Sequence, residues 1–267
     1  MAYSGQRFHG LTAIACAATL LLASVLPAQA SGDQNPGSTS AGRPPVSADF
    51  FFGRPRATVG VRGNWVFASA SGDIFDFITD ELTLDRSAFN KPALGVDLAV
   101  NVAPRIDVVA SFEGSRISRD SEYRDLVDNN LLPIAQTTSL GEAGFTAGLK
   151  FALLPPGRRV SRYAWIPAKV TPYVGGGGGM LHYNFRQVGD FVDYVDNSIF
   201  SSTFSSSGWA PSIYAAGGTD VHVYRHLFLT LEGRYTWSSA ELDRDFVDFA
   251  PMDLKGFRFG AGFHYAF

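Results

Sequence analysis

The C-terminal stretch Gly256-Phe-Arg-Phe-Gly-Ala-Gly-Phe-His-Tyr-Ala-Phe267 decides the fold of this chain. Its residues alternate between two faces, which is the period of a β-strand. A strand at the surface of a soluble protein would not show so many rings to water, whereas lipid on one side and a polar interior on the other explain both faces. One face carries Phe257, Phe259, Ala261, Phe263, Tyr265 and Phe267, and the other carries Arg258, Gly260, Gly262 and His264.

The same alternation recurs upstream and predicts further membrane-spanning strands of about ten residues. In each of them an apolar face opposes a face with charged or polar residues. The predicted lipid-facing sets are Val59, Val61, Trp65 and Phe67; Leu94, Val96, Leu98 and Val100; Ile106, Val108, Ala110 and Phe112; Phe145, Ala147, Leu149 and Phe151; Ile213, Ala215, Val221 and Val223; and Leu227, Leu229, Leu231, Tyr235 and Trp237.

One strand, over residues 171–186, is harder to orient because Gly175 to Gly179 carry no side chains. We expect its aromatic and aliphatic residues, Tyr173, Leu181, Tyr183 and Phe185, to face outward. With this strand the count is about eight, at which side chains just fill a barrel interior. The sequence therefore predicts an all-β fold, a closed antiparallel up-and-down transmembrane β-barrel.

The connections between strands predict the orientation of the barrel. Tight turns are expected near Ala103-Pro104 and at residues 224–226, with a moderately long exception at residues 155–168. Long polar loops are expected at residues 69–92, 116–138, 187–208 and 239–254. Since short turns of such barrels face the periplasm and long loops face outward, both termini are expected in the periplasm.

The N-terminal residues 1–30 have the pattern of a secretory signal peptide. Arg7 supplies the positive charge, an apolar stretch runs from Leu11 to Leu26, and cleavage is expected after Ala30. A lipoprotein signal ending at Cys16 is the alternative, but a long apolar run would then follow that cysteine. Residues 31–56, rich in Gly, Ser and Pro at their start, are expected to be a flexible periplasmic leader, and residues 57–267 the barrel.

Composition excludes several other classes of protein. Cys16 is the only cysteine, so the mature chain would hold no disulfide and no cysteine-based metal site. The net charge of −3 is close to zero and both signs are interspersed, which argues against a nucleic-acid partner. No second stretch approaches the roughly 20 apolar residues of a membrane helix.

The chain resembles the eight-stranded outer-membrane barrels related to the transmembrane domain of outer-membrane protein A and to its small-porin and surface-antigen relatives. Pro172-Tyr173-Val174-Gly175, the strand pair through residues 218–237 and the aromatic end carry this resemblance over residues 57–267. It implies location in the bacterial outer membrane, contact with outer-membrane lipid and lipopolysaccharide, and recognition of Phe267 by the assembly machinery. The peptidoglycan-binding domain of some relatives is not expected here.

The inward faces predict an ion-pair network in the lumen, because opposite charges in a narrow, poorly solvated space should pair. The inward charges are Arg62, Lys150, Arg234 and Arg258 with Asp97, Asp107, Glu113, Glu142, Asp220 and Glu232. Counting residues from the strand ends places Arg62, Asp97, Glu232 and Arg234 near mid-height of the barrel. Arg258, which also lies on an inward face, is included in the predicted network. The network is interpreted as structural filling that plugs the barrel, and a narrow or gated pore is the alternative.

The sequence predicts no catalytic, cofactor-binding or metal-binding residues. The glycine run lacks the Lys-Ser or Lys-Thr of a phosphate loop and more simply permits close packing. Some outer-membrane barrels modify lipid A with serine and histidine, and here only His182 approaches the outer end, near serines at 201–207. We therefore expect a non-enzymatic surface protein, with a small-solute porin as the alternative and a lipid A-modifying enzyme as a third. Its long acidic and aromatic loops are expected either to bind an extracellular ligand or to extend the strands beyond the bilayer as part of an aromatic girdle.

Overall fold

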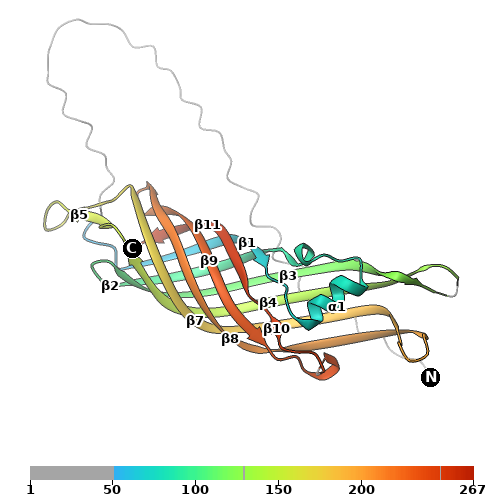
Figure 1. Ribbon diagram of the computed structural model, residues 1–267. Coiled ribbons are helices and arrows are strands. Elements are labelled where there is room, and N and C mark those ends of the chain that lie inside the picture. Colours follow the sequence, from blue (N-terminus) through green and yellow to red (C-terminus); the bar gives the residue numbers. More distant parts are fainter. Residues whose placement is uncertain (1–50, 129, 247) are drawn as a thin grey trace, which may run out of the picture. The chain divides into compact units, whose positions relative to one another are not determined.

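The computed structural model describes residues 51–128, 130–246 and 248–267. The expected signal peptide, its cleavage site, Cys16 and most of the expected leader lie outside these residues. Eight long strands form a closed antiparallel ring, in which each strand pairs with its neighbours and β1 pairs with β11 (Figure 1). They are β1 (Ala57–Ala68), β2 (Lys91–Ala103), β3 (Ile106–Val127), β4 (Pro133–Ala152), β7 (Val170–Val192), β8 (Ile199–Tyr224), β9 (Leu227–Ala240) and β11 (Gly256–Ala266). The predicted fold class is confirmed.

The outer surface of the ring is apolar, as the alternation predicts. Phe263, Trp65 and Leu94 are 54%, 47% and 63% exposed, and aromatic residues occur toward both ends of this apolar band. No helix among the described residues is long and apolar enough to cross a membrane. An exterior of this kind around a ring without free edges is that of a membrane-spanning barrel.

The predicted orientation of β7 is wrong. Tyr173, Leu181 and Tyr183 are at most 5% exposed and point into the barrel, whereas Val174 and Met180 face outward at 46% and 43% exposure. Phe185 is buried in the same way as the three inward residues. The prediction assumed that all large apolar side chains of a barrel strand meet lipid, but part of this interior is itself an apolar core.

Four strands are much longer than a membrane crossing requires. β3, β4, β7 and β8 have 22, 20, 23 and 26 residues, against about 9–11 for a tilted membrane strand. The expected loops at 116–138 and 187–208 are therefore mostly strand, and only their tips are turns. The extra length forms a four-stranded wall of residues 116–127, 133–141, 182–192 and 199–208, which projects at one end of the barrel (Figure 1).

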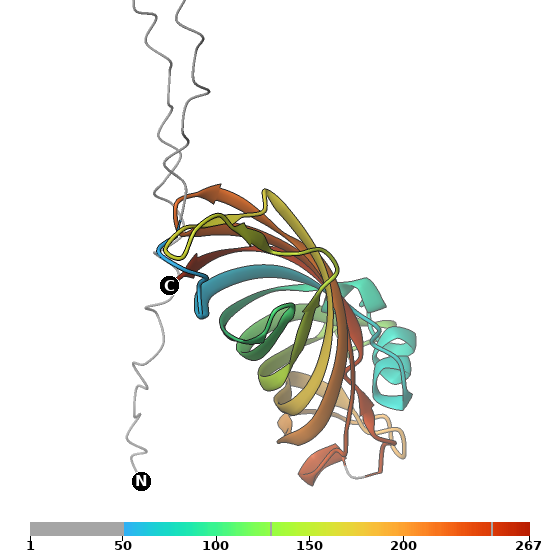
Figure 2. The ribbon, with the colours of Figure 1, turned by 90° about the vertical axis from the view of Figure 1, so that its left-hand side faces the viewer.

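The other two expected long loops fold against this wall as a cap. The cap comprises α1 (Asp73–Glu81), η1 (Arg86–Phe89), η2 (Arg244–Phe246) and β10 (Met252–Asp253), and α1 lies beside the wall in both ribbon views (Figures 1 and 2). The carboxylates of Asp73 and Asp76 lie in the first turn of α1, where negative charge stabilises a helix. Spacing places Ile74, Phe75 and Ile78 on one face of α1, and all three are at most 1% exposed.

The cap and the wall share one hydrophobic core, and the cap also covers the edges of the wall. Leu140, Leu181, Tyr183 and Phe185 of the wall side join Ile74, Phe75, Ile78, Leu82, Phe89, Phe246 and Met252 of the cap side. At the β3 edge the Thr83 N–H donates to the Glu122 carbonyl at 2.8 Å. At the β8 edge the Ser205 N–H donates to the Asp245 carboxylate at 2.8 Å. Covered edges do not offer a template for another strand.

The opposite end of the barrel is partly covered by a short hairpin and by the first described residues. The hairpin consists of β5 (Gly157–Arg159) and β6 (Trp165–Pro167). Phe51 is 4% exposed and forms a β-bridge with Trp165, and its ring lies 4.5 Å from the ring of His226. Phe51 falls within the flexible leader expected over 31–56, and its side chain is held in an aromatic cluster.

Replacing Phe75 with alanine should loosen the cap and leave the strand ring intact. Loss of a buried phenylalanine costs roughly 3–5 kcal/mol, and here the loss falls on the core between cap and wall. We expect faster tryptic cleavage at Arg86 and Arg124, measured by limited proteolysis, with an unchanged heat-dependent gel shift. Val195→Ala is the control, because Val195 is 93% exposed. Equal cleavage of both variants would contradict the shared core.

Candidate functional site

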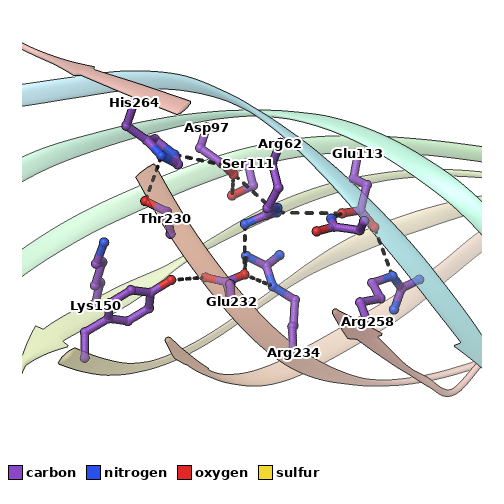
Figure 3. A network of polar contacts seen from close by, with 12 residues as sticks. Arg62, Asp97, Ser111, Glu113, Lys150, Thr230, Glu232, Arg234, Arg258 and His264 are labelled. Carbon is purple, nitrogen blue, oxygen red and sulfur yellow. Dashed lines mark hydrogen bonds and ion pairs between the residues drawn. The ribbon is translucent and has the colours of Figure 1, made fainter. Parts of the chain in front are cut away.

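The interior of the barrel at mid-height holds a network of buried charges centred on Arg62 of β1 (Figure 3). The Arg62 guanidinium lies 2.8 Å from Glu232 on β9 and 3.3 Å from Asp97 on β2. It also lies 3.7 Å from Glu113 on β3. Arg62 is only 4% exposed, so one cation in the middle of the lumen holds carboxylates from three strands.

The network continues toward the wall end through alternating charges. Arg258 of β11 lies 2.9 Å from Glu113 and 3.3 Å from Glu142 of β4. Glu142 in turn lies 2.5 Å from the ammonium of Lys91, a side chain with 0% exposure. Opposite charges thus alternate without interruption from Arg62 to Lys91 across the lumen.

On the β9 side the network is completed by a second arginine and a tyrosine. Arg234 lies 3.0 Å from Glu232, so that this carboxylate is shared between two guanidinium groups. The Tyr173 hydroxyl donates to the other oxygen of Glu232 at 2.8 Å. Arg234 also stacks over the ring of Tyr214, with 4.3 Å to its centroid. Such hydrogen bonds are needed to offset the cost of burying the charges.

Toward the short-turn end the same layer includes a histidine. His264 Nε2 lies 3.4 Å from Asp97, and its Nδ1 lies 2.9 Å from the hydroxyl of Thr230. That hydroxyl donates to Asp220, which pairs with Lys150 at 2.6 Å. A side chain at Gly60 would lie 2.2 Å from the His264 ring, so a residue without a side chain is required there.

The structure brings all five residues of the sequence-predicted set, Arg62, Asp97, Glu232, Arg234 and Arg258, into one network. Lys91 was predicted to lie in a loop, but it is the first residue of β2. Its inward position could have been recognised from the sequence, because Lys91, Ala93, Gly95 and Asp97 alternate on one face of that strand. Tyr173 was also predicted to face outward, because the glycines that follow it have no side chains that would show which face of the strand points inward. Asp107, counted among the inward charges, accepts a hydrogen bond from Asn101 at 2.7 Å.

The network separates two cavities of the lumen. A cavity of about 140 Å³ lies toward the short-turn end, where Arg62 and Glu232 contribute to its lining. A cavity of about 40 Å³ lies toward the wall end, lined in part by Glu113 and Arg258. The charged layer therefore lies between the two cavities, and the hydrophobic core under the cap lies beyond the smaller one.

The residues considered for catalysis do not come together in the described part of the chain. His182 of β7 faces away from the lumen, with its ring centroid 5.0 Å from that of Trp209. Ser206 is instead buried and hydrogen-bonded to Tyr183 and Asp243. Within residues 51–128, 130–246 and 248–267, no group of three or more His, Cys, Asp or Glu is placed to hold a metal ion.

No protein-family model matches the chain, and no curated protein matches it. Among solved structures, Neisserial surface protein A is similar at 10% identity and a TM-score of 0.41, over 79% of this chain and 97% of that chain. Ail, the attachment invasion locus protein of Yersinia pestis, is similar at 15% identity and a TM-score of 0.37, over 79% and 97%. A major outer membrane protein from Thermus thermophilus is similar at 11% identity and a TM-score of 0.39, over 79% and 99%. These likenesses concern the fold, and the assignment of a membrane-spanning barrel rests on the closed strand ring and apolar exterior of this chain.

Proposed function

We propose that this protein is a non-conducting barrel of the bacterial outer membrane that presents a folded wall for recognition at the cell surface. The proposal rests on side chains that occupy the lumen at two levels, which we interpret as two closures. The ion-pair layer around Arg62 crosses its middle, and the apolar core around Phe75 and Tyr183 fills the wall end. The proposal assigns no catalytic activity to the chain.

The lengths of the connections support an orientation with the wall outside the cell. β2 and β3 are joined by two residues, as are β8 and β9, whereas the wall end carries the long strands and the cap. In barrels of the outer membrane the short turns face the periplasm. In this orientation the apolar band contacts outer-membrane lipid and lipopolysaccharide. Phe267, which is 59% exposed at the end of the last strand, is then available as a signal to the assembly machinery.

The hairpin tips of the wall are the surface that best suits an extracellular ligand. Leu131 and Val195 are 80% and 93% exposed, although the N–H of Leu131 donates to the Asp128 carbonyl and that of Val195 to the Asp193 carboxylate. Asp128 accepts the N–H groups of Asn130 and Leu132, and the Leu132 bond lowers the pKa of its carboxyl. The tips therefore present aliphatic side chains beside carboxylates that stay ionised, which suits a protein ligand with apolar and basic groups.

The mature protein, folded as shown by a heat-dependent gel shift, should be silent in planar bilayers. Both closures block ion flow, so no steady conductance steps are expected from wild type. Single-channel recording is the measurement. Steady, ion-selective steps would favour the alternative of a small-solute porin and would make Arg62, Arg234, Asp97 and Glu232 the candidates for ion selectivity.

Removing the charge of Arg62 should destabilise the barrel without opening it. The Arg62→Gln variant leaves three carboxylates without their shared cation, and breaking a buried pair costs roughly 3–5 kcal/mol. Adding Glu232→Gln should cost less than the two single effects combined, as measured by urea unfolding of the folded barrel. Arg86→Gln is the control, because its pair with Asp76 is exposed and worth about 0–1 kcal/mol. A new conductance in the double variant would show that these charges gate a pore.

Changing the apolar tips should abolish recognition while the barrel still folds. Leu131→Ser combined with Leu132→Ser and Val195→Ser removes exposed side chains that support no core. We expect loss of adhesion of bacteria that display the variant to host cells or extracellular matrix, at unchanged surface level. Val59→Ala combined with Val61→Ala is the control, because these residues face lipid. Unchanged adhesion of the tip variant would remove the tips as the binding surface.

A further inference from the structure

The larger cavity of the lumen lies on the short-turn side of the network, and the exposed residues Arg56 and Arg105 are among its lining. It has a volume of about 140 Å³ and is closed on its inner side by Arg62, Glu232 and Arg234. Its lining combines apolar residues, among them Val109 and Leu149, with charged residues of both signs. A concave space lined by apolar side chains and by polar groups that can orient a ligand is the usual form of a small-molecule site.

Two buried hydroxyl groups in this cavity have no hydrogen-bond partner among the described residues. Tyr214 is 7% exposed and Thr171 is 5% exposed, and both line the cavity. The Tyr214 hydroxyl reaches across to β4, where a side chain at Gly148 would come within 2.4 Å of it. Neither hydroxyl oxygen is among the fully enclosed polar atoms without a partner, so both face the open space of the cavity, where they can donate to a bound molecule.

The charged groups of the cavity favour an acceptor as that partner. The carboxylates of Asp97, Glu232 and Asp220 are each held by at least one cation. Toward the mouth Asp107 accepts a hydrogen bond from Asn101. These carboxylates are therefore already paired, although one oxygen of Asp97 accepts no hydrogen bond, and the hydroxyls of Tyr214 and Thr171 can serve as donors to a ligand.

The cations of the cavity exceed its carboxylates. The lining contains Arg54, Arg56, Arg62, Arg105, Lys150 and Arg234 against Asp97, Asp107, Asp220 and Glu232. Arg54 donates to the Pro104 carbonyl at 2.7 Å, whereas Arg56 and Arg105 have no carboxylate partner in the described part of the chain. Both are exposed at the mouth, where they would attract an anion.

We propose that this cavity binds a small anion, a carboxylate or a phosphate, which enters from the short-turn end. The hydroxyls of Tyr214 and Thr171 donate hydrogen bonds to the anion, and Lys150 supplies a cation in the lining of the cavity. Arg56 and Arg105 at the mouth of the cavity guide its entry. The site lies at the opposite end of the barrel from the proposed recognition surface, so each of the two proposals can fail without the other.

The test is isothermal titration of the folded barrel in detergent micelles with inorganic phosphate and, separately, with succinate. Binding of at least one of them is expected, and which one binds identifies the class of anion. Tyr214→Phe should weaken that binding roughly tenfold or more, because a hydrogen bond to a charged group is lost. The protein itself loses no hydrogen bond in this variant, so the gel shift and the unfolding midpoint should stay unchanged. Tyr235→Phe on the outer face is the matched control.

A second variant tests the role of the mouth. Arg56→Gln combined with Arg105→Gln should weaken anion binding and reduce its dependence on salt, since exposed charges act through the solvent. The proposal is overturned if neither anion binds at millimolar concentration. Binding that is unaffected by Tyr214→Phe would likewise overturn it, because the anion would then lie elsewhere on the protein.

Discussion

The structure depends on one constraint: inside a lipid bilayer, every backbone N–H and C=O must find its partner within the protein. An open sheet would leave one row of these groups unpaired at each edge. Here the first and last strands pair along their whole length, from Thr58 with Ala266 to Ala68 with Gly256, and this pairing closes the ring. Once the ring is closed with eight strands, its interior is narrow enough for side chains to fill it.

The narrow interior explains the ion-pair network. A charge on an inward position has little water around it, so it stays ionised only beside an opposite charge that is hydrogen-bonded in turn. Arg62 meets this demand with Asp97, Glu113 and Glu232, and the alternation of charge continues to Lys91. Desolvation of the buried charges offsets much of their mutual attraction, so the network by itself is weak evidence for net stability.

Along the same inward faces the polar lumen changes into an apolar core. Tyr173 donates to Glu232 at mid-height, whereas Leu181, Tyr183 and Phe185, farther along β7, pack against the cap. Beyond the bilayer the strands no longer have lipid on their outer face, so their buried surface must come from the inner face. The wall and cap therefore fold in the manner of a soluble domain on top of a membrane barrel, and the two parts are held together by different interactions, ion pairs in one and apolar contacts in the other.

The sequence by itself determined the barrel fold and the inward faces of its strands other than β7, because a period of two with lipid on one side constrains every position of strands such as β11. It thereby placed Arg62, Asp97, Glu232, Arg234 and Arg258 on inward faces, although not their pairing. Tertiary structure alone decided the rest. The orientation of β7 depended on neighbours across the lumen, since five glycines erase the alternation. The cap and wall came from long segments that look like polar loops, because α1 buries its apolar face only against strands distant in sequence. The partners of each charge were likewise set by strand register, which determines which inward residues meet at one height.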